Sequence, residues 1–207
     1  MRKVHKSSPV RAKVGGKRER TRARLMEAAS QVIGEKGFHE TTLDEVAARA
    51  GMTRGAIYGN FKNREDLFLE VVRLRWEPIV PDFKPGGTFR EQMRAIGRAV
   101  VAAAPVRQKS AVGALSFQLF ALTHPDMRER ISKQNAEIYR RMAAGLVQFI
   151  SVDELPMPAE RFMRVLHALT DGLLFTRFLT PDLITEEVIL SAFEMIAPET
   201  RTRRGKR

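Results

Sequence analysis

The chain has 207 residues, of which 43% are hydrophobic, so it can form one or two domains with a proper core. It has no cysteine, which excludes disulfides and thiolate metal sites and fits the reducing cytoplasm, where we expect it to act. No apolar run reaches the ~18 residues of a membrane-spanning helix. The net charge of +12 lies in two tails: residues 1–24 carry +9 and residues 199–207 carry +4, which leaves −1 for the body.

The first predicted helix runs from Lys17 to Lys36. Its apolar residues follow the i, i+3, i+4, i+7, i+8 spacing that gives a helix one buried stripe; they are Leu25, Ala28, Ala29, Val32 and Ile33. Gly37 comes directly after this pattern and is expected to end the helix, because glycine adopts a positive φ at little cost.

The segment that follows has the pattern of a helix-turn-helix. Thr42 and Glu45 have the spacing of a capping box, which starts a short helix that Gly51 ends. Thr53 is the predicted N-cap of a second helix, which reaches Tyr58. This second helix begins with small and hydrogen-bonding side chains, as a helix that enters the major groove of DNA end-first requires.

The rest of the chain is predicted to be helical as well. After a turn at Phe61 and Lys62, Asn63 caps a fourth helix that is expected to reach about Trp76. Proline and glycine are concentrated at positions 78–87, which indicates a connector. Five further helices are predicted at Thr88–Ala104, Val106–Thr123, Pro125–Ile150, Pro158–Leu179 and Thr185–Ala197. No stretch alternates as a strand does, so the predicted fold class is all-α.

The last two predicted helices are apolar on almost every side. The apolar residues are Phe162, Val165, Leu166, Leu169, Leu173, Leu174 and Phe178 on one helix and Val188, Ile189, Leu190, Ala192, Phe193 and Ile196 on the other. Such helices need burial on more than one side, which a second chain can provide. The alternative is a central helix in a monomeric bundle.

The segment from Thr21 to Val72 resembles the DNA-binding domain of TetR-family transcriptional regulators. The matching stretches, in order and without gaps, are Ala28-Ala29, Gly37-Phe38, Thr41-Thr42, Val46-Ala47, Ala50-Gly51, Arg54-Gly55-Ala56-Ile57-Tyr58, Phe61-Lys62 and Glu65-Asp66-Leu67. One departure is Gly59-Asn60, where the family commonly has a bulky residue followed by His or Tyr. Asn60 can still bond to a phosphate, but it offers no aromatic ring.

The resemblance implies a ligand-responsive repressor that dimerises through its last two helices as a four-helix bundle. The partners would be a pseudo-palindromic double-stranded DNA operator, a small-molecule effector and a second copy of the chain, without a cofactor or a membrane. The expected divisions are a basic disordered arm at 1–16, a helix-turn-helix domain at 17–76, a connector at 77–87, a helical-bundle domain for ligand binding and dimerisation at 88–198, and a basic tail at 199–207.

The predicted DNA-binding residues are Thr42, Thr53, Arg54, Gly55, Ala56, Tyr58, Asn60 and Lys62. Thr42 and Thr53 lie at helix N-termini, where a hydroxyl and exposed N–H groups bind phosphate, although each can serve as a cap alone. Arg54 can contact guanine O6 and N7, a phosphate or solvent. Tyr58 presents a phenol to phosphate or packs, and Lys62 is a phosphate point charge.

The basic N-terminal segment has two interpretations. It can be a solvated tail that keeps the protein soluble, or it can lie along phosphates or in the minor groove. The second is favoured because Arg18, Arg20, Arg22 and Arg24 lead directly into the first helix, which holds the segment near the duplex.

The candidate ligand-lining residues in the C-terminal domain are Phe117, Phe120, Met127, Met142, Phe149, Met163, His167 and Asp171. Each apolar residue in this group is also an ordinary core candidate, since Met and Phe fill cores. His167 and Asp171 are four residues apart on one helical face, so they can pair with each other, orient a polar ligand or bind a metal. Of these three roles, we do not expect metal binding. Residues 77–198 carry fourteen basic and fourteen acidic side chains, which favours a mostly apolar effector.

Two functions from other classes compete with a regulator. One is an enzyme that uses His124, Asp126, His167 and Asp171 as acid–base groups, but no nucleophile motif or phosphate loop accompanies them, and we expect no catalytic site. The other is a nucleoid or RNA-binding protein that acts through its basic tails, which have no need of a capped helix-turn-helix. The sequence therefore favours a dimeric TetR-type repressor.

Overall fold

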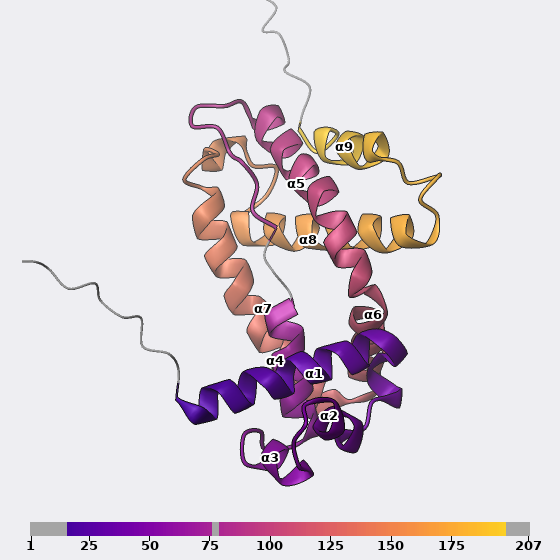
Figure 1. Ribbon diagram of the computed structural model, residues 1–207. Coiled ribbons are helices and arrows are strands. Elements are labelled where there is room, and N and C mark those ends of the chain that lie inside the picture. Colours follow the sequence, from indigo (N-terminus) through magenta and orange to yellow (C-terminus); the bar gives the residue numbers. More distant parts are fainter. Residues whose placement is uncertain (1–15, 76–78, 198–207) are drawn as a thin grey trace, which may run out of the picture.

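The computed structural model describes residues 16–75 and 79–197, and within these ranges every regular element is a helix (Figure 1). The elements are α1 (Lys17–Glu40), α2 (Leu43–Arg49), α3 (Arg54–Tyr58), α4 (Arg64–Arg75), α5 (Phe89–Lys109), α6 (Ala111–Thr123), α7 (Pro125–Leu146), the 3₁₀ turn η1 (Val152–Glu154), α8 (Ala159–Leu179) and α9 (Glu186–Glu194). The predicted all-α class is confirmed. The predicted arm before Gly16, Trp76 and the tail after Ala197 lie outside the described residues.

One predicted break is wrong. The sequence placed it at Pro105, but α5 continues through this proline to Lys109. The φ of proline suits a helix, and the ring removes only one donor, so the residues beyond it can still bond backward. The chain leaves the helical region at Ser110, whose hydroxyl donates to the carbonyl of Arg107 over 3.2 Å. The other predicted helix ends differ from the observed ones by at most four residues.

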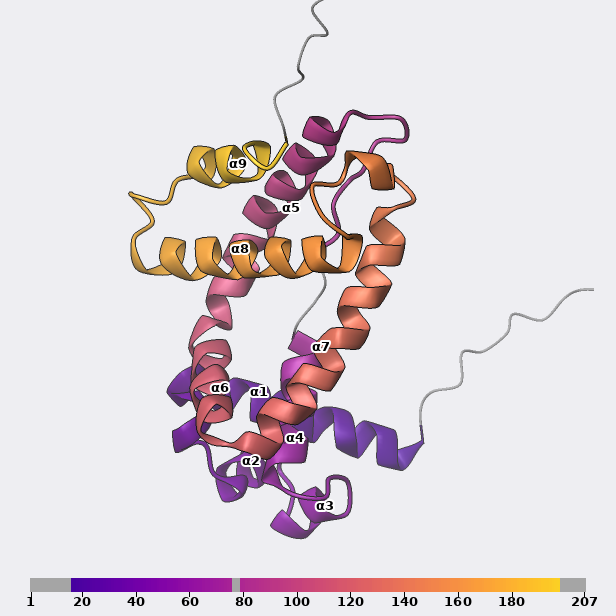
Figure 2. The ribbon, with the colours of Figure 1, turned by 180° about the vertical axis from the view of Figure 1, so that it is seen from behind.

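The apolar side chains form two cores. The division between these cores does not follow the connector in the sequence, because the first core contains residues from both sides of it. The first core belongs to the head, which we define as α1 to α4, and contains Leu25, Phe38, Ile57 and Phe68. It also takes in Phe117, Phe120 and Ala121 of α6 and Met127 of α7. The second core is formed by α5, α8, α9 and the end of α7. Helix α6 therefore belongs by sequence to the C-terminal half and by packing to the head, as Figures 1 and 2 show.

Helices α8 and α9 bury one side in the second core and expose apolar residues on the other. The buried residues are Phe162, Met163, Leu166 and Leu174 on α8 and Ile189 and Phe193 on α9. The exposed ones are Val165, Leu179 and Leu183 on α8 and the turn after it, and Val188 and Met195 on and just after α9. In the part of the chain that the structure describes, no helix is long and apolar enough to cross a bilayer.

Candidate DNA interface and effector site

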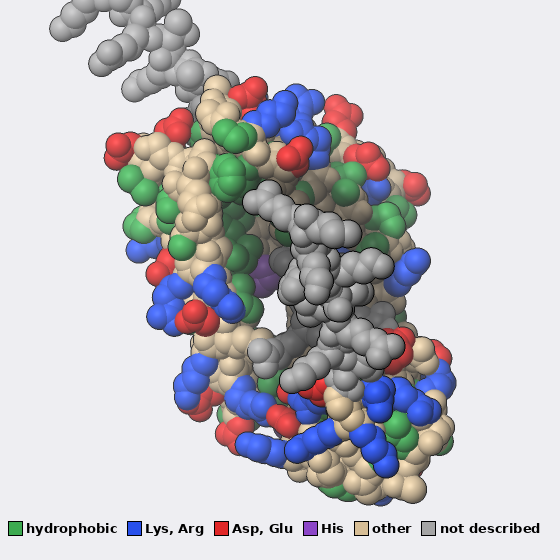
Figure 3. All heavy atoms as spheres, turned by 60° about the vertical axis from the view of Figure 1, so that its left-hand side comes forward, with side chains coloured by type: hydrophobic (Ala, Val, Ile, Leu, Met, Phe, Trp, Pro, Cys, Tyr) green, Lys and Arg blue, Asp and Glu red, His purple; other side chains and the backbone are tan. Residues whose placement is uncertain are grey.

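Helix α3 is anchored by one side chain and exposes the others. Ile57 is fully buried in the first core, whereas Arg54 and Gly55 are exposed and Ala56 is half-buried. Tyr58 is 53% exposed, which leaves its phenol accessible at the end of the helix. Figure 3 shows Lys and Arg side chains gathered on the head, at the lower end of the molecule. The exposed side of the helix can therefore approach a duplex, while the buried Ile57 fixes the position of the helix on the head.

Arg54 is oriented by two neighbours. Its Nη1 lies 3.1 Å from Oδ2 of Asp44 on α2, and its Nη2 donates to the hydroxyl of Tyr58 over 3.4 Å. The guanidinium also lies 5.9 Å from the centre of the Tyr58 ring. A guanidinium has five N–H donors, so these contacts orient the side chain and leave donors for a base edge or a phosphate.

The remaining predicted DNA-binding residues differ in what they can offer. The Thr42 hydroxyl donates to Oε2 of Glu45 over 2.9 Å, so its one proton is already used. Thr53 is exposed, and among the described contacts its side chain makes no capping bond to α3. Asn60 donates to the carbonyl of Ala56 over 2.8 Å, and its buried Oδ1 has no donor within the described residues. Lys62 is exposed next to α4.

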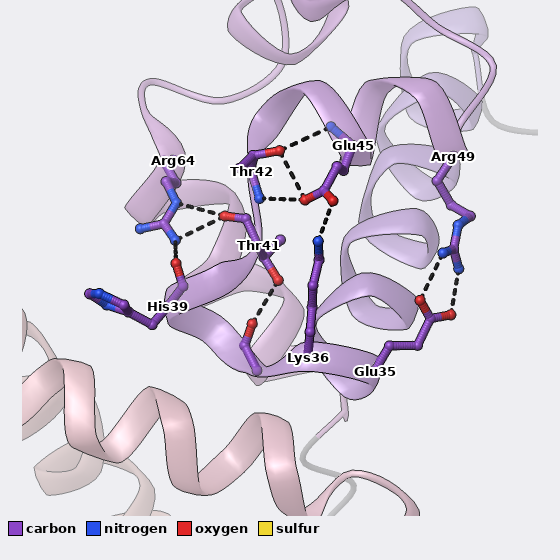
Figure 4. Close-up of polar contacts among 9 residues, drawn as sticks. Glu35, Lys36, His39, Thr41, Thr42, Glu45, Arg49 and Arg64 are labelled. Carbon is purple, nitrogen blue, oxygen red and sulfur yellow. Dashed lines mark hydrogen bonds and ion pairs between the residues drawn. The ribbon is translucent and has the colours of Figure 1, made fainter.

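A capping box and an ion pair hold the start of α2 on α1 (Figure 4). Thr42 Oγ1 accepts the N–H of Glu45 over 3.3 Å, and Glu45 accepts the N–H of Thr42 over 3.1 Å. Glu45 also pairs with Lys36 of α1. Lys36, followed by the N–H and hydroxyl of Thr42, lowers the pKa of Glu45 from 4.5 to about 2. The predicted capping box is confirmed, and the ion pair with α1 is an addition to it.

Two arginines connect the head helices in the same view (Figure 4). Arg49 of α2 forms a bidentate pair with Glu35 of α1 at 2.7 and 2.8 Å. Arg64 of α4 donates to the carbonyls of Phe38 at 2.6 Å and Thr41 at 3.0 Å, where α1 ends. Its guanidinium also covers the rings of Phe38 and Phe68, at 5.1 and 4.7 Å from their centres. Arg64 therefore satisfies carbonyls that a helix end leaves without partners.

The arginines at the start of α1 contact the two turns of the helix-turn-helix. Arg24 donates to the carbonyl of Ala50 over 2.8 Å, where α2 ends. Arg22 donates to the carbonyl of Asn60 over 2.7 Å, pairs with Glu70 and lies over the ring of Phe61. The expectation that these arginines hold the N-terminal segment near the duplex stays a prediction. In the structure, Arg22 and Arg24 also fix the two turns that flank α3.

The end of α1 meets α6 through a hydrogen bond and a group of rings. The N–H of Phe38 donates to the Ser116 hydroxyl over 2.7 Å, and the Phe38 ring lies 4.5 Å from Phe68 and Phe120 and 5.5 Å from Phe117, centre to centre. Gly37 has φ 83° and ψ 172°, a backbone region open almost only to glycine. Its positive φ confirms the predicted end of the regular helix, and it brings the chain against Ser116.

A cavity of about 90 Å³ lies where the head meets the C-terminal half. Its wall includes Ile33 of α1, Val71 of α4 and the turn between α5 and α6. From α8 it receives Leu174, Phe175, Phe178 and the carboxylate of Asp171. The cavity is mostly apolar, and its polar lining residues are Ser30, Arg107, Lys109, Ser110 and Asp171. A molecule bound there would contact both halves of the protein.

Asp171 ends a short row of polar side chains. The Tyr139 hydroxyl lies 2.8 Å from Nδ1 of His167, and Nε2 of His167 lies 3.5 Å from Oδ2 of Asp171. Burial raises the pKa of Asp171, against the opposing effects of His167 and Arg107. Burial also raises the pKa of Tyr139. The row thus joins α7 to α8, and it ends at the partly buried carboxylate of Asp171 in the cavity wall.

The structure distributes the predicted ligand residues over several places. Asp171 lines the cavity, and His167 lies directly behind it. Phe117, Phe120 and Met127 are in the first core, and Met163 is in the second. Met142 and Phe149 are 39% and 37% exposed, which leaves each at the surface. In the described part of the chain, no group of three or more His, Cys, Asp or Glu residues could bind a metal.

Two sequence families match the chain. The bacterial regulatory proteins of the tetR family match residues 25–71, and the C-terminal part of BetI-type transcriptional repressors matches residues 89–196, which is more than half of the chain. The chain belongs to the TetR family of transcriptional regulators. The resemblance seen in the helix-turn-helix is thereby confirmed and extended to the C-terminal domain.

Individual TetR regulators agree with this assignment. The regulator TtgR of Pseudomonas putida is 26% identical over 177 residues, which are 79% of this chain and 83% of TtgR. SrpR, also of Pseudomonas putida, is 37% identical over 73 residues. This match covers 35% of this chain and only 34% of the length of SrpR. The multidrug binding protein EbrR, solved with imidazole, has the same fold, with a TM-score of 0.68 and 21% identity over 95% of this chain and 100% of EbrR.

The family to which the chain belongs consists of bacterial regulatory proteins, and the relatives TtgR and SrpR are regulators as well. The two His–Asp pairs of the enzyme hypothesis lie apart from each other in the structure. His124 is at the turn between α6 and α7, stacked on Phe120, and Asp126 is in the first turn of α7. His167 lies instead on α8, where its ring contacts the Tyr139 hydroxyl of α7. The two His–Asp pairs thus belong to different packing environments.

Three functional contacts were not predicted from the sequence. Arg22 and Arg64 resemble any other arginine of a basic segment or a first helical turn, and no spacing signals the carbonyls to which they donate. Ser116 lies 78 residues from its partner Phe38. A signal did exist for Ser116: it is a hydrophilic residue between apolar ones on a helix without charge.

Proposed function

We propose that the protein is a cytoplasmic, homodimeric repressor that places α3 of each subunit in the major groove of a pseudo-palindromic operator. The observation that carries this is the exposed row formed by Thr53, Arg54 and Gly55 with Tyr58, on a helix whose flanking turns accept hydrogen bonds from α1. The match to BetI-type transcriptional repressors supports repression. The exposed apolar sides of α8 and α9 support dimerisation.

In this proposal Arg54 reads a base, because it is exposed and pre-oriented by Asp44 and Tyr58. Thr53, Tyr58 and Lys62 contact phosphates, and Gly55 and Ala56 allow the backbone to approach the base edges. Thr42 makes the smaller contribution, because its one hydroxyl proton is used within the head, whereas Asn60 uses one of its two N–H donors there. The division into arm, head, connector, C-terminal domain and tail follows the sequence boundaries.

The proposed effector is a small, mostly apolar molecule that binds in the cavity between α1, α4, α6 and α8. Phe175, Phe178 and Leu174 offer apolar contact, and Asp171 with His167 offers a polar group to orient the ligand. The overall fold is that of EbrR, a multidrug binding protein. A ligand that releases the operator must prefer the DNA-free form, because equal affinity for both forms shifts nothing.

A gel-shift series tests the DNA proposal. Duplexes selected from a random pool should share an inverted repeat with half-sites about one helical turn, ~34 Å, or a multiple apart. The protein should bind them far more tightly than random duplex. A nucleoid or RNA-binding protein that acts through its tails would bind all sequences alike, and that result would refute the proposal.

A second experiment tests the effector site. Compounds that raise the melting temperature of the free protein are tested for release of the selected operator, with Asp171→Asn and Phe178→Ala beside the wild type. Both variants should lose the response to the compound while keeping operator affinity. The matched control is Val152→Ala, since Val152 is exposed on η1 and lies outside the cavity wall. A response unchanged in both cavity variants would exclude this cavity as the effector site.

A further inference from the structure

Helix α6 exposes a stripe of large aliphatic side chains that the function proposed so far does not use. Its members are 43–66% exposed: Val112 (55%), Leu115 (43%), Leu119 (66%) and Leu122 (66%). They are spaced i, i+3, i+7 and i+10, so they form one line along the helix. We call these four residues the α6 stripe. Contiguous apolar surface of this kind marks interaction sites in soluble proteins.

The stripe is not a loosely held segment. The opposite side of α6 is fixed to the head: Phe117 and Phe120 are in the first core, and Ser116 accepts the N–H of Phe38. At Gly113 the approach to α1 is so close that an added Cβ would lie 3.0 Å from Cγ2 of Ile33. The four side chains therefore face solvent from a helix whose orientation is set by packing on its other side.

The chemistry of the stripe favours a partner that is itself uncharged and apolar. None of the thirteen residues of α6 is charged, so the helix offers no ionic partner to a charged protein or to nucleic acid. Apolar residues that repeat alternately three and four positions apart form the seam along which two helices with this repeat pack together. A second copy of the chain brings such a helix with it.

Position and size favour the same partner. Helix α6 adjoins α8, because Ala111 and Ala114 share a cavity wall with Leu174 and Phe178, and Figure 2 shows α6 below the C-terminal half of α8. The stripe is thus on a helix that adjoins the C-terminal half of α8, at whose end Leu179 is exposed. Helices α8 and α9 have 21 and 9 residues, of which only the outward sides are accessible, whereas an interface of ordinary size uses about 20–30 residues from each partner.

We propose that the α6 stripe is buried by a second copy of the chain, as a continuation of the α8–α9 dimer interface on which this inference rests. Because α6 also packs in the core of the head, this contact sets the separation of the two heads. The dimer geometry is then transmitted to the operator through α6. A change that moves α6 at the interface moves α1 with it, through Ser116 and Phe38.

Cysteine reactivity tests this directly, because the chain has no cysteine of its own. Leu119→Cys and Leu122→Cys are each labelled with a bulky maleimide at concentrations far below and far above the dimer dissociation constant, which light scattering gives. The matched control is Val152→Cys, since Val152 and Leu119 are 65% and 66% exposed in the single chain. Labelling of the stripe should be roughly tenfold slower in the dimer, while the control reacts at one rate throughout.

A charge substitution provides a second measurement. Leu119→Lys should weaken dimerisation by roughly tenfold or more, whereas Val152→Lys should leave it unchanged. Circular dichroism verifies that both variants remain folded, as expected for exposed positions. A dimer in which Leu119→Cys reacts as fast as the control, or in which Leu119→Lys has no effect, overturns this inference alone. A chain that stays monomeric at every concentration overturns the proposed dimer together with it.

Discussion

Arginines of one short region have different roles because of where their carbonyl and carboxylate neighbours lie. Arg22, Arg24 and Arg64 donate to carbonyls at turns and helix ends, at 2.6–2.8 Å for the shortest contact of each. Removal of such a donor leaves a carbonyl without its partner, which is more costly than the net value of the bond. Arg54 has an acidic partner and an exposed position, so its remaining donors face outward.

The first prediction separates reading from positioning on α3. Arg54→Ala should cost about 1–3 kcal/mol on the best operator and relax the preference at one base position of each half-site. Tyr58→Phe should weaken all sequences alike, by roughly 0.5–1.5 kcal/mol, because it removes one phosphate hydrogen bond. Selection of binding sites from a random pool measures both. An unchanged motif with Arg54→Ala would show that this arginine does not read bases.

The second prediction concerns pH and Glu45. The pKa of this carboxyl is lowered from 4.5 to about 2 by Lys36 and Thr42, so its ionised form stabilises the folded protein. The stabilisation is complete above the unfolded pKa and is lost as the pH falls from about 5 towards 2. The melting temperature of Glu45→Gln should lie below that of the wild type at pH 7, with a difference that shrinks over this range.

The matched variant for this experiment is Lys36→Gln, which removes the largest cause of the shift and keeps the capping box. It should lose the part of this pH-dependent stabilisation that depends on Lys36 and keep the part that depends on Thr42. A difference between wild type and Glu45→Gln that stays constant from pH 7 to pH 3 would show that Glu45 acts only as a neutral cap.

At the scale of elements, the junction of α1 and α6 depends on one backbone conformation. Gly37 turns the chain so that Phe38 meets Ser116 and enters the ring group shared by both halves. Thr41 donates to the carbonyl of Gly37 over 2.7 Å and is 1% exposed, so the turn is also closed from the other side. Ile33 of α1 and residues of α6 both line the effector cavity. A change in the cavity can therefore reach the head through this junction.

The third prediction compares two glycines of α1. Gly37→Ala should destabilise the protein by about 1–3 kcal/mol, because φ 83° and ψ 172° are strained for any other residue and the new Cβ would lie 3.3 Å from Ser116. Gly34→Ala should stabilise it by roughly 0.5–1 kcal/mol, since Gly34 is helical and its Cβ would meet no atom within 4 Å. Urea unfolding measures both, and equal effects would contradict the assigned strain.

At the scale of the whole molecule, charge and shape are divided between different parts of the chain. Residues 25–198 sum to −1, and residues 1–24 carry +9. Residues 17–24 of this segment form the start of α1, so its charge is divided between the N-terminal arm and the first turns of the head. The release of counterions from DNA, which controls the salt dependence of binding, should depend on the N-terminal segment more than on the head.

The fourth prediction tests that division. Deletion of residues 1–16 removes Arg2, Lys3, Lys6, Arg11 and Lys13 and leaves α1 intact. The slope of log affinity against log salt should become shallower by about one to three, because each phosphate that the segment neutralises contributes roughly 0.9 to that slope. Binding to random and specific duplex should weaken alike, while base preference remains. An unchanged slope in the truncated protein would show that this segment is a solvated tail.

The sequence by itself determined the local features of this protein. Caps, glycines and the helical repeat of apolar residues predicted the all-α class, the helix-turn-helix and its capping box, because each of these depends on residues only a few positions apart. The exposed row on α3 could be named for the same reason. The helix end predicted at Pro105 was wrong. The proline removes only one hydrogen-bond donor, and the helix ends instead where the backbone leaves the helical region, at Ser110.

Only the tertiary structure decided which distant groups meet. It assigned α6 to the core of the head, gave Arg22 and Arg64 their carbonyls, and brought Asp171 to a cavity shared with α1. These contacts join residues 23 to more than 100 positions apart, and no local spacing records them. Apolar periodicity states that a helix side must be buried but does not name the partner, which packing of the whole chain selects.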